Sequence, residues 1–151
     1  MKSKKLGKLR PLHGKPIKEL AGSKRKLIPF LDKKLEFVLI NAGSSGHDIS
    51  DNFENVIENF LNCESVVKES VAQTLFEFVQ DTKAECEIKP SSVKDIWEYI
   101  RMWNVTINQL GNGSFYACIM CGLKSTIEDL SGVQINFRNG NEFEGVCDQT
   151  G

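Results

Sequence analysis

The spacing of apolar residues changes once along this chain, and no other feature limits the fold as strongly. Between residues 53 and 100 apolar side chains recur every three or four positions, whereas from residue 103 they alternate with polar ones. The first spacing buries one face of a helix, and the second buries one face of a strand. Central helices followed by strands predict an α+β domain.

Three central helices are expected. Ser50 is a good N-cap for the first helix, and a second helix is expected from about residue 65 to residue 80. The third begins where Ser92 and Asp95 are spaced like a capping box with Asp in place of Glu, and it ends near Arg101. The apolar stripe of the first helix consists of Phe53, Val56, Ile57, Phe60 and Leu61.

Strands are expected on both sides of the helices. Two short apolar runs, residues 27–31 and 35–40, predict an N-terminal β-hairpin. Alternating segments, together with residues 115–121, which are apolar on both faces as in a central strand, predict a C-terminal antiparallel β-meander of about four strands. In the first of these strands Trp103, Val105 and Ile107 share a half-buried face. The four segments cover residues 103–108, 115–121, 133–138 and 142–146.

The register of the last hairpin can be predicted from its two faces. A two-residue Asn139-Gly140 loop would place Phe143 on the face opposite Phe137. A three-residue loop that includes Asn141 pairs Phe137 with Phe143 and keeps both faces consistent. We therefore expect the three-residue loop, with Asn141 in the left-handed region that Asn tolerates.

Charge is distributed unevenly along the chain. Residues 1–34 hold 12 of the 19 Lys and Arg residues and two acidic ones, so this segment carries +10 and the rest carries −11. Residues 1–26 are rich in Lys, Gly and Pro and show no apolar period. They are expected to form a basic extension that is flexible or ordered only by docking, and residues 27–151 to form a single α+β domain.

The basic extension offers the first candidate interaction residues, Lys24, Arg25 and Lys26. Such a cluster could bind a polyanion through phosphates, dock on the acidic body, or only solubilise the chain. No aromatic residues are interleaved with the cluster, which argues against base-stacking recognition of nucleic acid. Nucleic acid is therefore not the expected partner.

Composition predicts a globular protein of the cytoplasm. The chain is 40% hydrophobic and 26% charged, and no apolar run approaches the ~20 residues of a membrane helix. No apolar segment typical of a secretory signal follows the basic N-terminus. No contact with a membrane is therefore expected. The five cysteines are odd in number and irregularly spaced, which favours reduced thiols in the cytosol.

The Cys118-x-x-Cys121 pair could in principle form a redox couple or half of a zinc site. A redox pair is expected at a helix N-terminus, whereas these two residues lie in a predicted strand and face opposite sides of it. Buried core thiols are the favoured interpretation. No metal and no cofactor is predicted.

Glu128 and Asp129 are the candidate carboxylate pair, located before the last hairpin. Neighbouring carboxylates can serve acid/base or metal-assisted chemistry, although solvated loop charge is the commoner role. His47, in a Gly/Ser loop, and His13, in the extension, are weaker candidates. The chain lacks the sequence signatures of common hydrolases, metalloproteases and NTPases, so no catalytic residue is predicted.

Several short motifs occur in a familiar order and carry a resemblance. These are Pro29-Phe30-Leu31, Leu35-Glu36-Phe37-Val38-Leu39, Ile57-x-x-Phe60-Leu61, Ser92-x-x-Asp95-Ile96-Trp97 and Gly132-Val133-Gln134-Ile135-x-Phe137-Arg138-Asn139-Gly140. From about Ile28 to Gly151 the chain resembles an uncharacterised bacterial family, a domain of unknown function. Members often carry Trp-Glu-x-Glu-His-Gly before the hairpin, whereas residues 127–132 here lack the Trp, the second Glu and the His. The resemblance implies no activity.

The leading hypothesis is a small, non-enzymatic α+β binding module, of an interaction or immunity type, whose acidic surface meets a basic protein partner. One alternative is an enzyme with a carboxylate or metal-assisted site around Glu128 and Asp129. Another is polyanion binding by the basic extension. The sequence does not indicate an oligomeric state.

Overall fold

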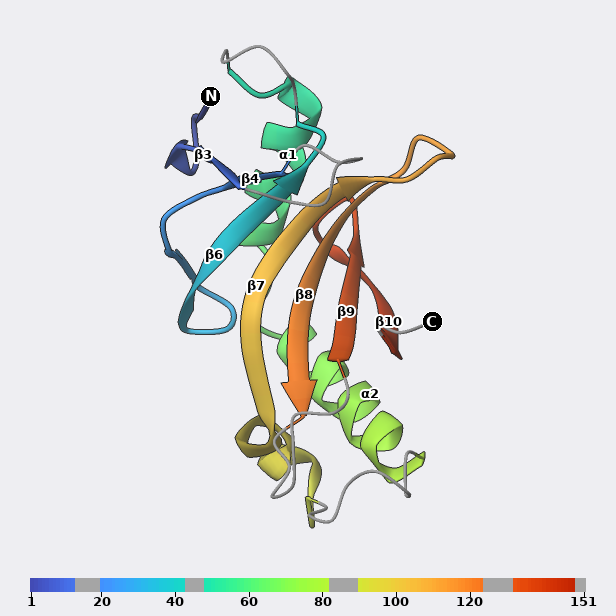
Figure 1. Cartoon of the computed structure of the whole chain (residues 1–151). Helices are drawn as coiled ribbons and strands as arrows, with labels where there is room; N and C mark the ends of the chain where they lie inside the picture. The colour runs from blue at the N-terminus through green and yellow to red at the C-terminus, as the bar shows by residue number, and fades with distance from the viewer. Residues whose placement is uncertain (13–19, 43–47, 82–89, 124–131, 149–151) are drawn as a thin grey trace.

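An eight-stranded β-sheet forms the main layer of the protein, and the helices pack against one face of this sheet (Figure 1). The computed structural model describes residues 1–12, 20–42, 48–81, 90–123 and 132–148. The strand order is β10-β9-β8-β7-β6-β4-β3, with β5 paired to β6 outside this path. The α+β class is therefore confirmed, with strands before and after the helices.

The strands and helices have the following bounds. The N-terminal strands are β1 (Lys2–Ser3), β2 (Gly7–Lys8), β3 (Arg10–Leu12), β4 (Leu20–Gly22), β5 (Lys26–Ile28) and β6 (Lys33–Ile40). The helices are α1 (Asp51–Leu61), α2 (Val67–Asp81) and the 3₁₀ helix η1 (Val93–Tyr99). The C-terminal strands are β7 (Ile100–Gln109), β8 (Phe115–Leu123), β9 (Gly132–Arg138) and β10 (Glu142–Asp148).

Both predicted strand groups are confirmed, and a parallel pair joins them. The strands β5 and β6 form the N-terminal hairpin, while β7 to β10 form the antiparallel meander. Between the two groups β6 runs parallel to β7, with Phe37 opposite Val105. A parallel pair needs a long crossover, and the segment with the three helices supplies it.

The helices begin close to where the sequence predicts. The Ser50 hydroxyl accepts a hydrogen bond from the Phe53 N–H at 3.4 Å, which confirms the N-cap of α1. The third helix is a 3₁₀ helix, and Ser92 makes no side-chain cap bond, so the capping-box expectation is wrong. Instead, Ser91 Oγ donates to Asp95 Oδ2 at 2.9 Å. Because Ile100 is already extended and starts β7, this segment is a short connector, where 3₁₀ geometry is common.

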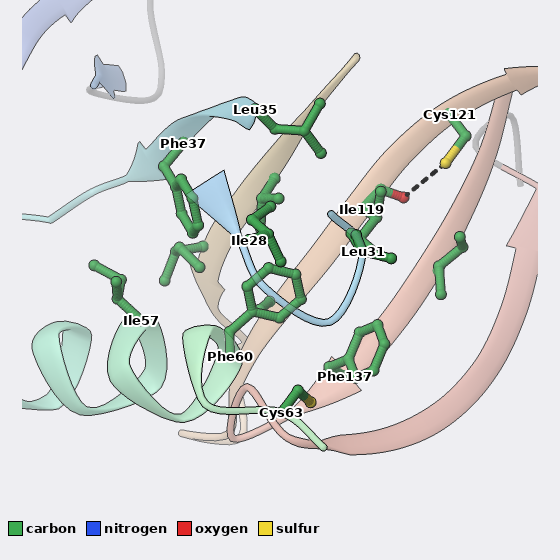
Figure 2. Packing of buried hydrophobic residues seen from close by; sticks show 14 of the residues in the cluster. Ile28, Leu31, Leu35, Phe37, Ile57, Phe60, Cys63, Ile119, Cys121 and Phe137 are labelled. Carbon is green, nitrogen blue, oxygen red and sulfur yellow. Dashed lines mark hydrogen bonds between the residues drawn. The ribbon is translucent and has the colours of Figure 1, made fainter. Parts of the chain in front are cut away.

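Four phenylalanines form the centre of the core. Phe60 of α1 packs edge-to-face on Phe30, Phe37 and Phe137, with ring centroids 5.4, 6.0 and 5.5 Å away. Figure 2 shows Phe60 pointing from the helix toward the strands that carry Phe37 and Phe137. This cluster joins α1 to the N-terminal hairpin and to β9. One core therefore unites both strand groups.

The register of the last hairpin is confirmed, whereas the predicted left-handed residue is wrong. Phe143 pairs with Phe137 and Glu142 with Arg138. Positive φ occurs at Asn139 (53°) and Gly140 (90°), and Asn141 is not among the positive-φ residues. The Arg138 carbonyl accepts from the Asn141 N–H at 3.2 Å, and a tight turn with two left-handed central residues explains this bond.

The described residues within 1–26 contact the rest of the protein. The strand β4 pairs with β6, and β3 pairs with β4. Leu9 is buried, and the buried Glu54 of α1 accepts hydrogen bonds from the Ser3 hydroxyl and the Lys4 N–H. Backbone pairing and a buried carboxylate hold these residues in place, in addition to the salt bridge of 3.4 Å between Lys5 and Glu58.

Among the described residues, no helix has both the length and the apolar character needed to cross a membrane.

Candidate functional site

A bulge in β7 turns Trp103 away from the core. The pairing of β7 with β8 shifts between Met102 and Asn104, so Trp103 is the extra residue. A bulge residue reverses the alternation of faces, and Trp103 is consequently 43% exposed while Val105 is buried. The expectation that Trp103 shares a face with Val105 and Ile107 is therefore wrong.

Gly122 of β8 provides the space in which the Trp103 ring lies. A Cβ atom at Gly122 would lie 2.5 Å from Cζ2 of Trp103 and within 3.3 Å of two more ring atoms. Any larger residue would collide with the indole. The ring is thus supported by the backbone of β8, and its remaining surface faces solvent.

A pocket of about 500 Å³ lies beside this indole. Its walls come from the β5–β6 hairpin and from the start of β7, which the parallel pairing of β6 and β7 brings together. The pocket is lined by Arg25, Lys33, Lys34, Leu35, Ile100, Arg101, Met102 and Trp103. We call this the basic pocket, since four of its eight lining residues are cationic.

The charge of the basic pocket is weakly compensated. Arg25, Lys33 and Lys34 are exposed, and no salt bridge to them occurs among the described residues. Arg101 makes an interaction of its own. Two acidic residues lie nearby in the chain, Asp32 directly before Lys33 and Glu36 two positions after Lys34. Clustered Lys and Arg side chains with an exposed indole favour binding of an anion that also has a flat apolar part.

The helices carry the opposite charge. Residues 51–81 contain seven acidic residues and one basic residue, so this segment has a net charge of −6. We call its exposed carboxylates the acidic helical layer; they belong to Asp51, Glu58, Glu64, Glu69 and Glu77. Val66, between α1 and α2, is 60% exposed within this layer. A charged surface around an apolar side chain is suited to contact with a basic protein.

A smaller hollow of about 270 Å³ lies on the sheet face opposite the core. Its polar groups bond to one another, since the Tyr116 hydroxyl donates to Glu144 Oε2 at 2.6 Å and Arg138 lies 3.7 Å from the same carboxylate. The hydrogen bond to Glu144 raises the pKa of Tyr116. This hollow is lined by Asn108, Leu110, Tyr116, Cys118, Gln134, Asn136 and Glu144.

The two cysteines of the C-x-x-C pair are buried, as expected. Cys121 belongs to the core cluster, whereas Cys118 lies three residues earlier on the other face of β8, next to Gln134. Burial raises the pKa of each thiol to about 12 and that of Cys63 to about 11. Within the described residues, no three His, Cys, Asp or Glu side chains are grouped as a metal site would require.

The buried thiols are expected to react slowly in the native protein. Only the thiolate is nucleophilic, and a pKa of about 12 leaves roughly one part in ten thousand as thiolate at pH 8. In a Cys86→Ser background, Ellman's reagent should label the exposed Cys147 within minutes and the other thiols only after unfolding. The reaction of Cys118 should accelerate as the pH rises toward 12. Rapid labelling of two or more thiols at pH 8 would contradict this burial.

The structure brings one sequence candidate to the basic pocket. Lys24, Arg25 and Lys26 are all exposed, but Arg25 alone among them lines this pocket. Glu128, Asp129, His13 and His47 lie outside the described residues. Of the other lining residues, only the adjacent Lys33 and Lys34 could have been suspected from the sequence, because they belong to the positively charged segment 1–34.

The comparisons with known proteins gave one match. A family model described as a domain of unknown function (DUF6985) matches residues 12–151. No curated protein and no solved structure matches the chain. The match starts 16 residues before Ile28, where the sequence resemblance began, and includes all lining residues of the basic pocket.

Proposed function

The chain belongs to the DUF6985 family of unknown function, and we propose that it is a non-enzymatic module whose acidic helical layer binds a basic protein partner. The observation that carries this proposal is the net charge of −6 on residues 51–81. In its most specific form, the proposal is that the chain is an immunity-type protein of the cytoplasm. Complementary charge speeds association and suppresses wrong partners, which suits such a role.

Most charges of the acidic helical layer are available to a partner. Among the described residues, its one salt bridge joins Glu58 to Lys5. The single basic residue of the segment, Lys68, places its Nζ 5.4 Å from the centre of the Trp97 ring. Glu64 and Glu69 lie two and three positions from the exposed Val66, so an apolar contact at this point would have two carboxylates close by along the chain.

Charge reversal tests this proposal. The full chain is used to capture proteins from a lysate of its native host, once at about 0.1 M salt and once at about 1 M salt. The Debye length is about 10 Å at the lower concentration and about 3 Å at the higher one, so charge attraction is screened at high salt. A specific partner should be recovered at low salt and lost at high salt. The variant Glu64→Lys/Glu69→Lys/Glu77→Lys should recover at least about tenfold less of it, because repulsion replaces attraction.

A matched control reverses charge elsewhere on the surface. Lys33→Glu/Lys34→Glu alters exposed residues of β6 that do not belong to the acidic helical layer. This control makes the chain more negative and should capture the partner at least as well as the unmodified chain does. Recovery that is unchanged by salt, or equal loss in both variants, would contradict the proposal.

A further inference from the structure

We propose that the basic pocket binds a nucleoside polyphosphate. This site shares no residue with the acidic helical layer, so it would be a second binding function of the chain. Its volume of about 500 Å³ lies within the range of about 300–1,000 Å³ that is typical of small-molecule sites. The cations and the indole of the pocket would recognise different parts of such a ligand.

The cations of the basic pocket are suited to bind the phosphates of such a ligand. Arg25, Lys33 and Lys34 come from one hairpin, and Arg101 joins them from the neighbouring parallel strand. Three of these side chains have no acidic partner among the described residues, so a bound anion would provide their compensating charge. Phosphate oxygens accept hydrogen bonds from Arg in a forked geometry and from Lys as a point charge. Several cations around one pocket favour a ligand with several phosphates over one with a single charge.

The exposed indole of Trp103 is suited to stack on a planar ring of the ligand. Trp103 is 43% exposed although it is a large aromatic residue inside a strand. Gly122 has no side chain, so the ring can lie close against the backbone of β8. A base can stack on such a preformed surface, and stacking tolerates any base. The buried side chains Leu35 and Ile100 complete the apolar part of the lining.

Calorimetric titration of the full chain tests this assignment with three probes: ATP, inorganic triphosphate and adenosine. ATP should bind most tightly, triphosphate at least about fivefold more weakly, and adenosine below detection, since the phosphates supply most of the attraction. Arg25→Gln/Lys34→Gln should weaken ATP binding at least about tenfold. The control Lys2→Gln/Lys8→Gln removes the same charge from exposed positions in strands β1 and β2 and should leave ATP binding unchanged.

Variants at the indole separate ring recognition from phosphate recognition. Trp103→Ala should weaken ATP binding at least about fivefold and leave triphosphate binding unchanged, while Trp103→Phe retains a flat ring and should restore most of the affinity for ATP. Gly122→Ala displaces the indole without removing it and should behave like Trp103→Ala. Absence of saturable ATP binding at millimolar concentration would overturn the proposal. Equal affinity for ATP and triphosphate, or equal weakening by the control variant, would overturn it as well.

Discussion

Replacing Phe60 with alanine is expected to lower the free energy of unfolding by about 3–5 kcal/mol. Phe60 is fully buried, and its ring contacts Phe30, Phe37 and Phe137 edge-to-face. Removing the ring leaves a cavity where α1 meets both strand groups, and their backbones cannot close around it. Since a domain of this size is stable by only about 5–15 kcal/mol, the loss is a large part of the total.

Urea unfolding followed by circular dichroism measures this loss. Val66→Ala is the control, because Val66 is 60% exposed and its truncation should change stability by less than about 0.5 kcal/mol. A loss below about 1.5 kcal/mol for Phe60→Ala would show that the phenylalanine cluster is not the centre of the core. A similar loss for Val66→Ala would show that the connection between α1 and α2 is buried.

The predictions from sequence succeeded where local spacing determines the structure. The apolar stripe of α1 follows from the spacing of Phe53, Val56, Ile57 and Phe60, all of which are buried. The register of the last hairpin follows from the need to keep Phe137 and Phe143 on one face. In both cases the deciding residues lie within a few positions of one another, so no knowledge of distant contacts is needed.

Two local predictions failed, the capping box at Ser92 and the left-handed conformation of Asn141. The other failures occurred where the structure depends on distant partners. The bulge at Trp103 depends on how β7 pairs with β8, and alternation alone cannot reveal an extra residue. The strands β1 to β4 contain two or three residues each, too few to show any period, and they form by pairing with each other or with β6. The basic pocket was missed for the same reason, because Arg101 and Trp103 reach Lys33 and Lys34 only through the parallel pairing of β6 and β7.

The uneven charge of the sequence corresponds to two surfaces in the structure. Three cations of the basic pocket come from residues 25–34 of the positive segment, and the acidic helical layer comes from residues 51–81. Part of the positive segment also builds the sheet, since β4 pairs with β6. Six of its 12 cations lie in strands, and two of these, Lys33 and Lys34, line the basic pocket together with Trp103. This placement favours a defined anion site over a solubilising tail.

Replacing Gly140 with alanine is expected to cost about 2–5 kcal/mol of stability, because two separate penalties combine. Gly140 has a φ of 90°, which disfavours any residue with a Cβ atom. The added Cβ would also lie 2.2 Å from the carbonyl oxygen of Val56 and 3.0 Å from the backbone nitrogen of Phe60. Both atoms belong to the backbone of α1, so the whole helix would have to move away from the turn, and the hydrogen bond of 2.9 Å from Asn59 Nδ2 to the Asn139 carbonyl would break.

Gly113→Ala separates the two penalties. Gly113 has a φ of 89°, almost the same as Gly140, but a Cβ atom there would meet nothing within 4 Å. Its substitution should therefore cost only the backbone strain, about 1–2 kcal/mol. The difference between the two variants in urea unfolding measures the contact between α1 and the turn of the last hairpin. Equal losses would mean that α1 does not pack on this turn.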